Sequence, residues 1–369
     1  MNSHIENHII EIETVGPLFV GSGQNYGKKE IIFDTYNKKV HIPNAKKMAQ
    51  YFMKNSMLRK YEEFMFGYEK DFGKWLYKNN IKKDIYEKWI DYTLDGSESD
   101  MGNAQVKQVA AFVKDPFQLP YVPGSSLKGA IRTILLASEI IQNKSSDREY
   151  NKIADKISKA EFRNRKNYLN FEMKELESKV FNTRELNDRK QDAINDVMAG
   201  IRISDSKPLS QEDLILCQKI DVAPNGESNR MPILRECIRP GVKIKFMLTI
   251  DASITSILVG DIIEAINIFL DSYNESFDSK FKNYDDFDKN VIYLGGGSGF
   301  VSKTILYPLL GSNAVSSVSK IIENTLPSKM KNEHKHYQDV RKGVSPHTIK
   351  KTMYADHLLS FGACKIKID

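Results

Sequence analysis

Glycines and serines gathered in three short segments are the residues of this sequence best suited to bind a ligand. Glycine has no Cβ and readily adopts positive φ angles, so several backbone N–H groups can converge on one anion. Basic residues lie within or just after two of the segments, which favours a phosphate as that anion. The residues expected to form the site are Gly21, Ser22, Gly23, Tyr26, Gly124, Ser125, Ser126, Lys128, Arg132, Gly295, Gly296, Gly297, Ser298, Gly299 and Lys303.

The middle segment predicts the start of a helix. A Pro123-Gly124 turn is followed by serines able to cap the helix, and a helix N-terminus offers unpaired amides and a positive dipole end to an anion. Lys128 and Arg132 are four residues apart and therefore share a helix face. The apolar stripe expected to anchor the helix on a sheet is formed by Leu127, Ile131 and Leu135. The segment thus predicts a phosphate cradle attached to a core.

The glycine spacings disfavour the common nucleotide-binding sites. A P-loop needs Lys-Ser or Lys-Thr directly after its last glycine, but Ala130 follows Gly129 here. The glycines of the first segment, Gly21, Gly23 and Gly27, miss the spacing of the dinucleotide-binding motif by one residue. The third segment has Phe300 where that motif needs its last glycine. A nucleotide-binding enzyme stays an alternative, which predicts saturable ATP binding at residues 123–132. No cofactor is expected.

Histidines and cysteines give no pattern for a metal or catalytic site. The sequence has no HExxH motif and no cluster of carboxylates, and its three cysteines are scattered without a CxxC pair. The histidines, His41, His334, His336, His347 and His357 among them, are expected to be structural or exposed. We therefore predict no metal ligands and no catalytic residues.

The elements that must position the glycine segments follow from hydrophobic periodicity. Strands are expected at residues 8–15, 30–34, 38–42, 241–250, 291–294 and 363–368, and helices at 45–66, 71–92, from 124 onward and at 253–273. Residues 21–27 are expected to form a loop. Dense alternating charges at 143–192 predict exposed helices outside the core.

The length of 369 residues favours two domains, which we place at residues 1–199 and 200–369. Each half offers a strand, a helix and a strand that runs into a glycine loop, which predicts two α+β modules with helical insertions at 45–92 and 143–192. The net charge of +6 favours an anionic partner, and basic residues concentrate at 329–351. The absence of a long apolar run or a signal core, together with unpaired cysteines, is typical of a cytoplasmic protein.

Four segments, in this order, resemble the RAMP superfamily of CRISPR-associated proteins. They are Gly16–Gly23, Tyr121–Arg132, Arg202–Pro208 and Gly295–Gly299. The resemblance implies two ferredoxin-like (RRM-like) domains that pack against a guide RNA (crRNA). Phosphate contacts carry no base information, which suits guides of varying sequence. The ring of Tyr26, beside the first segment, is expected either to stack on a base or to pack against the core.

Within the superfamily, the sequence most resembles the family of fifth Csm subunits of type III-A effector complexes. That resemblance implies a cap on the 3′ end of the crRNA and a role in crRNA maturation and antiviral defence. It also implies partners: the repeated RAMP backbone subunit, the small helical subunit, and a host nuclease that trims the guide.

The number of residues between the first two glycine segments argues against assigning this chain to the target-cleaving subunits of the superfamily. Those subunits have a short interval with a catalytic aspartate, whereas about a hundred residues intervene here, and Asp34 is a candidate turn residue. We therefore expect a non-catalytic RNA-binding subunit. A metal-independent endoribonuclease acting on precursor RNA stays an alternative, because an acid–base pair can be distant in sequence.

Overall fold

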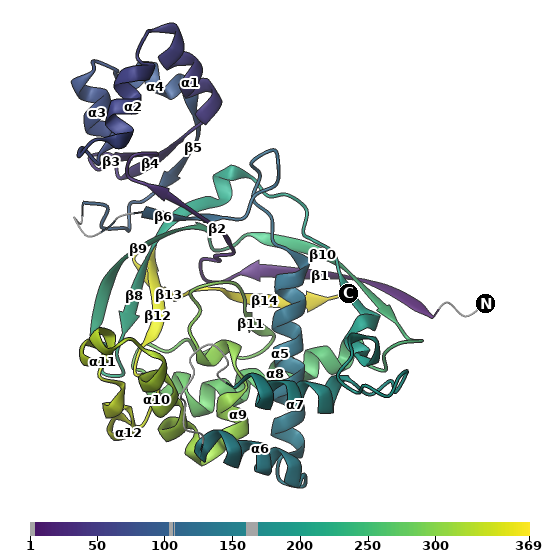
Figure 1. Ribbon diagram of the computed structural model, residues 1–369. Coiled ribbons are helices and arrows are strands. Elements are labelled where there is room, and N and C mark those ends of the chain that lie inside the picture. Colours follow the sequence, from purple (N-terminus) through teal and green to yellow (C-terminus); the bar gives the residue numbers. More distant parts are fainter. Residues whose placement is uncertain (1–3, 103–105, 107, 160–168) are drawn as a thin grey trace.

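Two β-sheets organise the chain in the computed structural model (Figure 1), which describes residues 4–102, 106, 108–159 and 169–369. Part of the expected second insertion, residues 160–168, lies outside the described residues. The first sheet has the strand order β11-β14-β1-β10-β7, and every neighbouring pair in it is antiparallel. Its strands are β1 (Ile5–Thr14), β7 (Ile201–Ile203), β10 (Lys243–Asp251), β11 (Val291–Tyr293) and β14 (Ala363–Ile368).

The first sheet has the topology of a ferredoxin-like module. Helix α5 (Gly124–Asn143) connects β1 to β7, and α8 (Val259–Ser276) follows β10 and precedes β14. The two helices contact each other beneath the sheet (Figure 1). In β1, Ile10 and Ile12 are fully buried, as the alternation of the sequence predicts. The predicted α+β fold class is confirmed.

Strand pairing joins the two ends of the chain. Strand β1 lies between β10 and β14, with Ile12 opposite both Ile244 and Ile366. Strands from both sides of the expected boundary at 199/200 therefore share one sheet. The assignment of two domains to residues 1–199 and 200–369 stays a prediction.

The second sheet contains nine strands, with the order β2-β6-β9-β8-β5-β4-β3 and with β12 pairing with β8 and β13. The strands are β2 (Gly21–Gly27), β3 (Ile32–Asp34), β4 (Lys39–Pro43), β5 (Ile90–Asp95), β6 (Gln108–Phe112), β8 (Leu214–Val222), β9 (Ser228–Ile238), β12 (Ile349–Tyr354) and β13 (His357–Ser360). The strands expected at 30–34 and 38–42 are confirmed as β3 and β4, which pair as a hairpin. The long hairpin of β8 and β9 is absent from the sequence prediction.

A buried carboxylate fixes the centre of the second sheet. Glu236 of β9 is fully buried and accepts a hydrogen bond from Tyr92 (2.5 Å) and one from the backbone N–H of Phe112 (2.9 Å). The ammonium of Lys114 forms an ion pair with the same carboxylate at 2.5 Å. Such a buried charge is tolerated because it is paired and fully hydrogen-bonded.

The first helical insertion forms a small unit at the top of Figure 1, away from the main body. It comprises α1 (Ala45–Lys54), α2 (Leu58–Phe66), α3 (Phe72–Lys78) and α4 (Lys83–Tyr86), which enclose an apolar cluster of their own. The expectation of a helix up to residue 92 is wrong, because Ile90–Asp95 pairs with β4 as a strand.

The second insertion belongs to the main core, contrary to expectation. Its helices α6 (Arg148–Lys159) and α7 (Asn170–Phe181) bury Tyr150, Ile153 and Phe181 in the same cluster as the sheets. The C-terminal region adds α9 (Leu306–Leu310), α10 (Ala314–Thr325), α11 (Ser328–His334) and α12 (Asp339–Lys342). Among the helices of the described ranges, none has the length and apolar content needed to span a membrane.

Two of the glycines of the motif segments are required by close backbone packing. A Cβ on Gly124 would overlap the carbonyl oxygens of Ile203 and Ser204. A Cβ on Gly295, where φ is +73°, would overlap the carbonyl oxygen of Phe19. These spaces are therefore filled by the protein itself and not by a ligand.

The packing predicts the cost of adding one methyl group. Gly124→Ala should lower the free energy of unfolding by about 1–3 kcal/mol, because backbone atoms must move to admit the Cβ. Gly260→Ala is the matched control, since a Cβ at that helical glycine meets no atom within 4 Å. Denaturant unfolding of both variants measures the difference, and equal stabilities would contradict the packing account.

Candidate anion-binding site

The three glycine segments meet at one pocket of about 410 Å³. The first segment contributes Gly21, the middle one contributes Ser126 and Gly129 of α5, and the last one contributes Gly295 and Gly296. Thr133 and Lys303 also line it. The structure thus brings together residues that are more than 270 positions apart in the sequence, as expected of a single binding surface.

The first segment is an edge strand and not the expected loop. Gly21 pairs with Phe112 of β6, and the register shifts between Gly21 and Asn25, so the intervening residues form an irregularity in β2. Gly23 adopts φ +85°, and a Cβ there would meet no atom within 4 Å. The Ser22 hydroxyl donates a hydrogen bond to the carbonyl of Ala111 (3.3 Å). Open space therefore surrounds Gly23.

Tyr26 lies on β2 beside the buried Glu236 group. Its ring is half-buried, and the ammonium of Lys114 is 5.8 Å from the ring centroid. Burial and the negative charge of Glu236 raise the pKa of the Tyr26 phenol. The ring thus packs within the protein, and its stacking on a base stays a prediction.

An internal carboxylate occupies the start of α5. The backbone N–H of Gly124 donates to Asp205 Oδ1 at 2.8 Å, and Val122 N–H donates to the Ser206 hydroxyl at 2.9 Å. The expectation of a serine cap is wrong, because the capping residue is Pro123, which offers no side-chain hydrogen bond. Two of the four motif segments thus bind each other here. Ser125 is exposed, and Ser126 is half-buried at the pocket wall.

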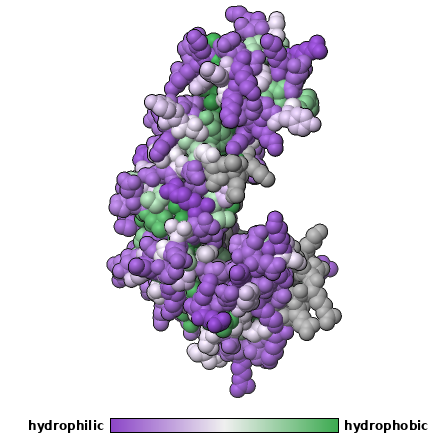
Figure 2. Space-filling model, turned by 90° about the vertical axis from the view of Figure 1, so that its left-hand side faces the viewer, coloured by the Kyte–Doolittle hydropathy of each residue, from purple (hydrophilic) through white to green (hydrophobic). Residues whose placement is uncertain are grey.

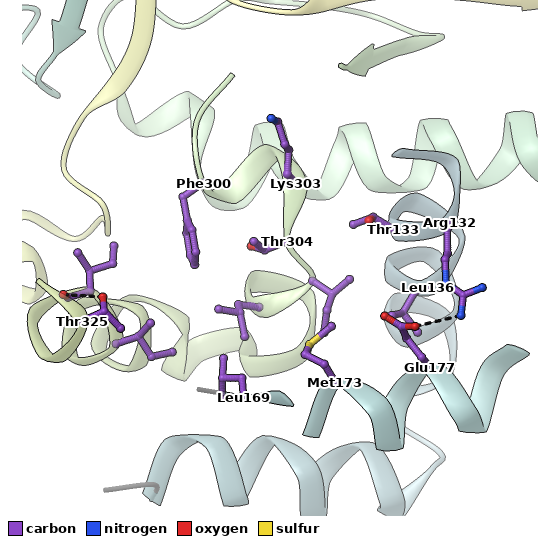
Figure 3. Close-up of a pocket in the computed structure, with 14 residues that line it drawn as sticks. Arg132, Thr133, Leu136, Leu169, Met173, Glu177, Phe300, Lys303, Thr304 and Thr325 are labelled. Carbon is purple, nitrogen blue, oxygen red and sulfur yellow. Dashed lines mark hydrogen bonds and ion pairs between the residues drawn. The ribbon is translucent and has the colours of Figure 1, made fainter. Parts of the chain in front are cut away.

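Lys128 and Arg132 are engaged within the chain. Lys128 donates to the carbonyl of Met198 at 2.8 Å, and burial lowers its pKa. Arg132 forms an ion pair with Asp196 at 2.8 Å and a second one with Glu177 at 3.0 Å, which Figure 3 shows. Their contact with an external phosphate stays a prediction.

The last glycine segment is held against the first. Gly295, Gly297 and Gly299 all have positive φ angles, and Gly296 N–H donates to the carbonyl of Phe19 at 2.6 Å. The ammonium of Lys303 contacts the carbonyl of Gly295, and partial burial lowers its pKa. The hydroxyl of Ser298 is buried and has no hydrogen-bond partner among the described residues. In this segment the Ser298 hydroxyl is therefore left without a partner among the described residues, whereas Lys303 is engaged with the carbonyl of Gly295.

Arg235 of β9 lies beside the last glycine segment and was not among the residues that the sequence predicted. Its Nη1 is buried without a hydrogen-bond partner in the described part of the chain. This atom lies 3.1 Å from the position that a Cβ added to Gly297 would occupy. The guanidinium stacks on the rings of Phe19 (5.3 Å) and Phe361 (5.5 Å). Burial lowers its pKa, but arginine stays charged in proteins, so this cation suits an anionic ligand.

A second pocket of about 430 Å³ adjoins the first through Thr133 and Lys303 (Figure 3). Its wall is largely apolar, and Phe300 and Met173 are two of its members. The Thr304 hydroxyl is buried without a partner among the described residues. A ligand that lies along the glycine segments thus has an apolar recess beside it.

The basic stretch at 329–351 is only partly free. Lys350 forms an ion pair with Asp221 at 2.9 Å, and Lys351 is 1% exposed and pairs with Asp285 at 2.8 Å. The remaining basic residues lie on or beside α11 and α12, within the largely hydrophilic face of Figure 2. They are Lys329, Lys331, Lys335, Arg341 and Lys342.

His41 has an acidic neighbour that sequence distance did not reveal. Its Nε2 lies 3.9 Å from Asp34, and its Nδ1 is 2.8 Å from the Thr93 hydroxyl. The side chain is buried, which lowers its pKa. Asp34 accepts hydrogen bonds from the N–H (3.0 Å) and the side-chain amide (2.7 Å) of Asn37, which confirms its turn role.

Comparisons with known proteins agree with the motif segments. The model of the RAMP superfamily matches residues 11–352. A Mycobacterium tuberculosis protein named CRISPR system Cms protein Csm5 is 25% identical over 395 residues, covering 100% of this chain and 99% of the relative. A Streptococcus thermophilus protein of the same name is 29% identical over 309 residues, covering 80% and 79%.

Two solved structures share the fold. A chain in the cryo-EM structure of a Csm–crRNA–target RNA ternary complex of a type III-A CRISPR-Cas system has a TM-score of 0.66 at 17% identity, covering 98% of this chain and 100% of that chain. The crystal structure of T. onnurineus Csm5 has a TM-score of 0.58 at 16% identity, covering 96% and 99%.

The contrast between two buried cations gives a stability prediction. Arg235→Met should leave the melting temperature unchanged or raise it, because it removes a buried charge that lacks an ion-pair partner while keeping apolar contact with the rings. Lys114→Met should instead cost about 3–5 kcal/mol, since it leaves Glu236 buried and unpaired. Thermal unfolding compares the two, and a large loss for Arg235→Met would show that this arginine serves the fold.

Proposed function

Because this chain belongs to the RAMP superfamily, we propose that it is an RNA-binding subunit of a type III-A CRISPR (Csm) effector complex. It binds the crRNA, caps the 3′ end and supports crRNA maturation. Its protein partners are the repeated RAMP backbone subunit, the small helical subunit and a host trimming nuclease. The names of the relatives and the fold shared with a chain of a Csm complex support this assignment.

One observation carries the proposal: the three glycine segments line a common pocket. A phosphate of the crRNA backbone lies there, beside Gly129 and Lys303. Packing does not require a glycine at position 129, because a Cβ there would meet no atom of the described residues within 4 Å. Its missing side chain leaves room for the RNA backbone.

The cations of the site divide between fold and ligand. Lys128 and Arg132 bind the chain itself and fix α5, whereas Nη1 of Arg235, next to Gly297, is buried without a hydrogen-bond partner in the part of the chain that the structure describes. Lys303 lines the pocket and exchanges its contact with the carbonyl of Gly295 for a phosphate, so that Lys303 and Arg235 carry most of the attraction for RNA. Phosphate contacts position a strand without reading its bases, which suits guides of varying sequence.

Charge placed at Gly129 tests this assignment. Gly129→Glu should weaken binding of single-stranded RNA about tenfold, or ~1.4 kcal/mol, because a carboxylate then faces the phosphates. Gly260→Glu is the matched control, because it makes the same change at an exposed glycine of α8. A Cβ at Gly260 would likewise meet no atom of the described residues within 4 Å. Filter binding over a range of salt concentrations measures both.

Two results would contradict the proposal. One is equal RNA affinity of the two glutamate variants, which would place the RNA elsewhere. The other is affinity of the unchanged chain that does not fall as salt rises, because phosphate contacts release counterions.

The proposed subunit performs no cleavage itself. The purified chain should leave labelled precursor RNA intact, both with magnesium and in EDTA. Clean cleavage in EDTA that His41→Ala abolishes would instead establish the ribonuclease alternative. The burial of His41 and its contacts to Asp34 and Thr93 favour a structural role.

A further inference from the structure

Two histidines and an aspartate from the C-terminal region converge in a buried cluster. His336 Nδ1 lies 2.9 Å from one carboxylate oxygen of Asp339, and His347 Nδ1 lies 2.5 Å from the other. One donor atom from each residue fits within a span of 4.8 Å. Two imidazoles and a carboxylate are ligands that divalent transition metals prefer.

Hydrogen bonds from α9 and α10 hold the segments that carry the three residues. The Ser319 hydroxyl donates to the carbonyl of His336 at 2.7 Å. The Tyr307 hydroxyl donates to the carbonyl of Ser345 at 2.7 Å and accepts from the Ser345 N–H at 3.1 Å. Anchors on α9 and α10 thus fix the segments that carry the ligands. A preformed set of ligands reduces the ordering cost of binding a metal.

The carboxylate is fully withdrawn from water. Asp339 is 0% exposed and accepts a hydrogen bond from the Ser345 hydroxyl at 2.7 Å, in addition to its contacts with the histidines. A buried carboxylate that faces two imidazoles presents donor atoms that a divalent cation needs.

We propose that His336, Asp339 and His347 bind one divalent transition metal ion of the zinc class. Ligand distances of about 2.0–2.2 Å place two ligands of one tetrahedral ion roughly 3.4 Å apart. The imidazole–carboxylate distances of 2.9 and 2.5 Å therefore lengthen, and a separation of up to 4.8 Å shortens, when the ion binds. The Nδ1 atoms serve as ligands, and each histidine keeps its proton on Nε2. Water or the Ser345 hydroxyl completes the coordination.

The metal has a structural role that goes beyond RNA binding. The ligands lie at spacings of three and eight residues, which match none of the common motifs, so the sequence predicted no metal site. The ion fastens α12 and the segment that enters β12. Next to His347, Thr348 and Lys350 line a small pocket together with Ser298 and Phe300. The metal site therefore stabilises the wall of this pocket, to which the last glycine segment contributes Ser298.

Metal binding to the full chain tests the proposal without RNA. The untagged protein, freed of metal by a chelator and dialysed, should take up one Zn²⁺ per chain in calorimetry and in elemental analysis. Magnesium should not replace it, because Mg²⁺ prefers oxygen ligands. Zn²⁺ should also raise the melting temperature by several degrees, since it binds the folded state alone.

His347→Ala should weaken Zn²⁺ binding at least tenfold, while His357→Ala, at an exposed histidine outside the cluster, should bind as the unchanged chain does. If His347→Ala does not fold, X-ray absorption of the unchanged chain loaded with Zn²⁺ identifies the ligands of the ion. We expect imidazole nitrogen and oxygen ligands. No bound Zn²⁺, a sulfur-ligand spectrum from cysteines, or unchanged affinity of His347→Ala would overturn the proposal. None of these measurements involves RNA, so a failure of the metal site is distinguishable from a failure of the proposed RNA binding.

Discussion

Backbone packed directly on backbone at glycines is the constraint on which the rest of this structure depends. Gly124 lies against Ile203 and Ser204, Gly295 against Phe19, and Gly362 against Leu294, at distances that leave no room for a Cβ. Each contact joins segments that are far apart in the sequence. The contacts fix the start of α5 on the segment after β7, and the loop after β11 on the segment before β2, and these elements line one pocket.

The same constraint divides the glycines into two groups with different roles. Those filled by the chain itself build the pocket, whereas a Cβ on Gly23 or on Gly129 would meet no atom of the described residues within 4 Å. The polar groups divide in the same way. Asp205 accepts from the amide of Gly124, and Arg132 is paired with Asp196 and Glu177, but Nη1 of Arg235 has no hydrogen-bond partner among the described residues. The groups left over are those suited to a phosphate.

Sequence reasoning found the segments of the site but not their internal contacts. Spacing predicted α5, β10 and β14, because their periodicity and glycine boundaries are local signals. It missed the hairpin of β8 and β9, and with it Arg235, because burial on one sheet is decided by distant strands. It also left α6 and α7 outside the core, since their few apolar residues matter only once α5 packs on them. The His336, Asp339 and His347 cluster depends on a turn of the chain that no motif describes.

The central claim is that RNA lies along the pocket built by the three glycine segments. Ultraviolet cross-linking of the chain to the RNA that co-purifies with its assembled complex, followed by mass spectrometry, tests it most directly. The account predicts repeat-derived guide RNA, cross-linked to peptides that contain residues 121–132 and 293–303. Cross-links confined to the helical unit of α1–α4, with none at these peptides, would contradict it.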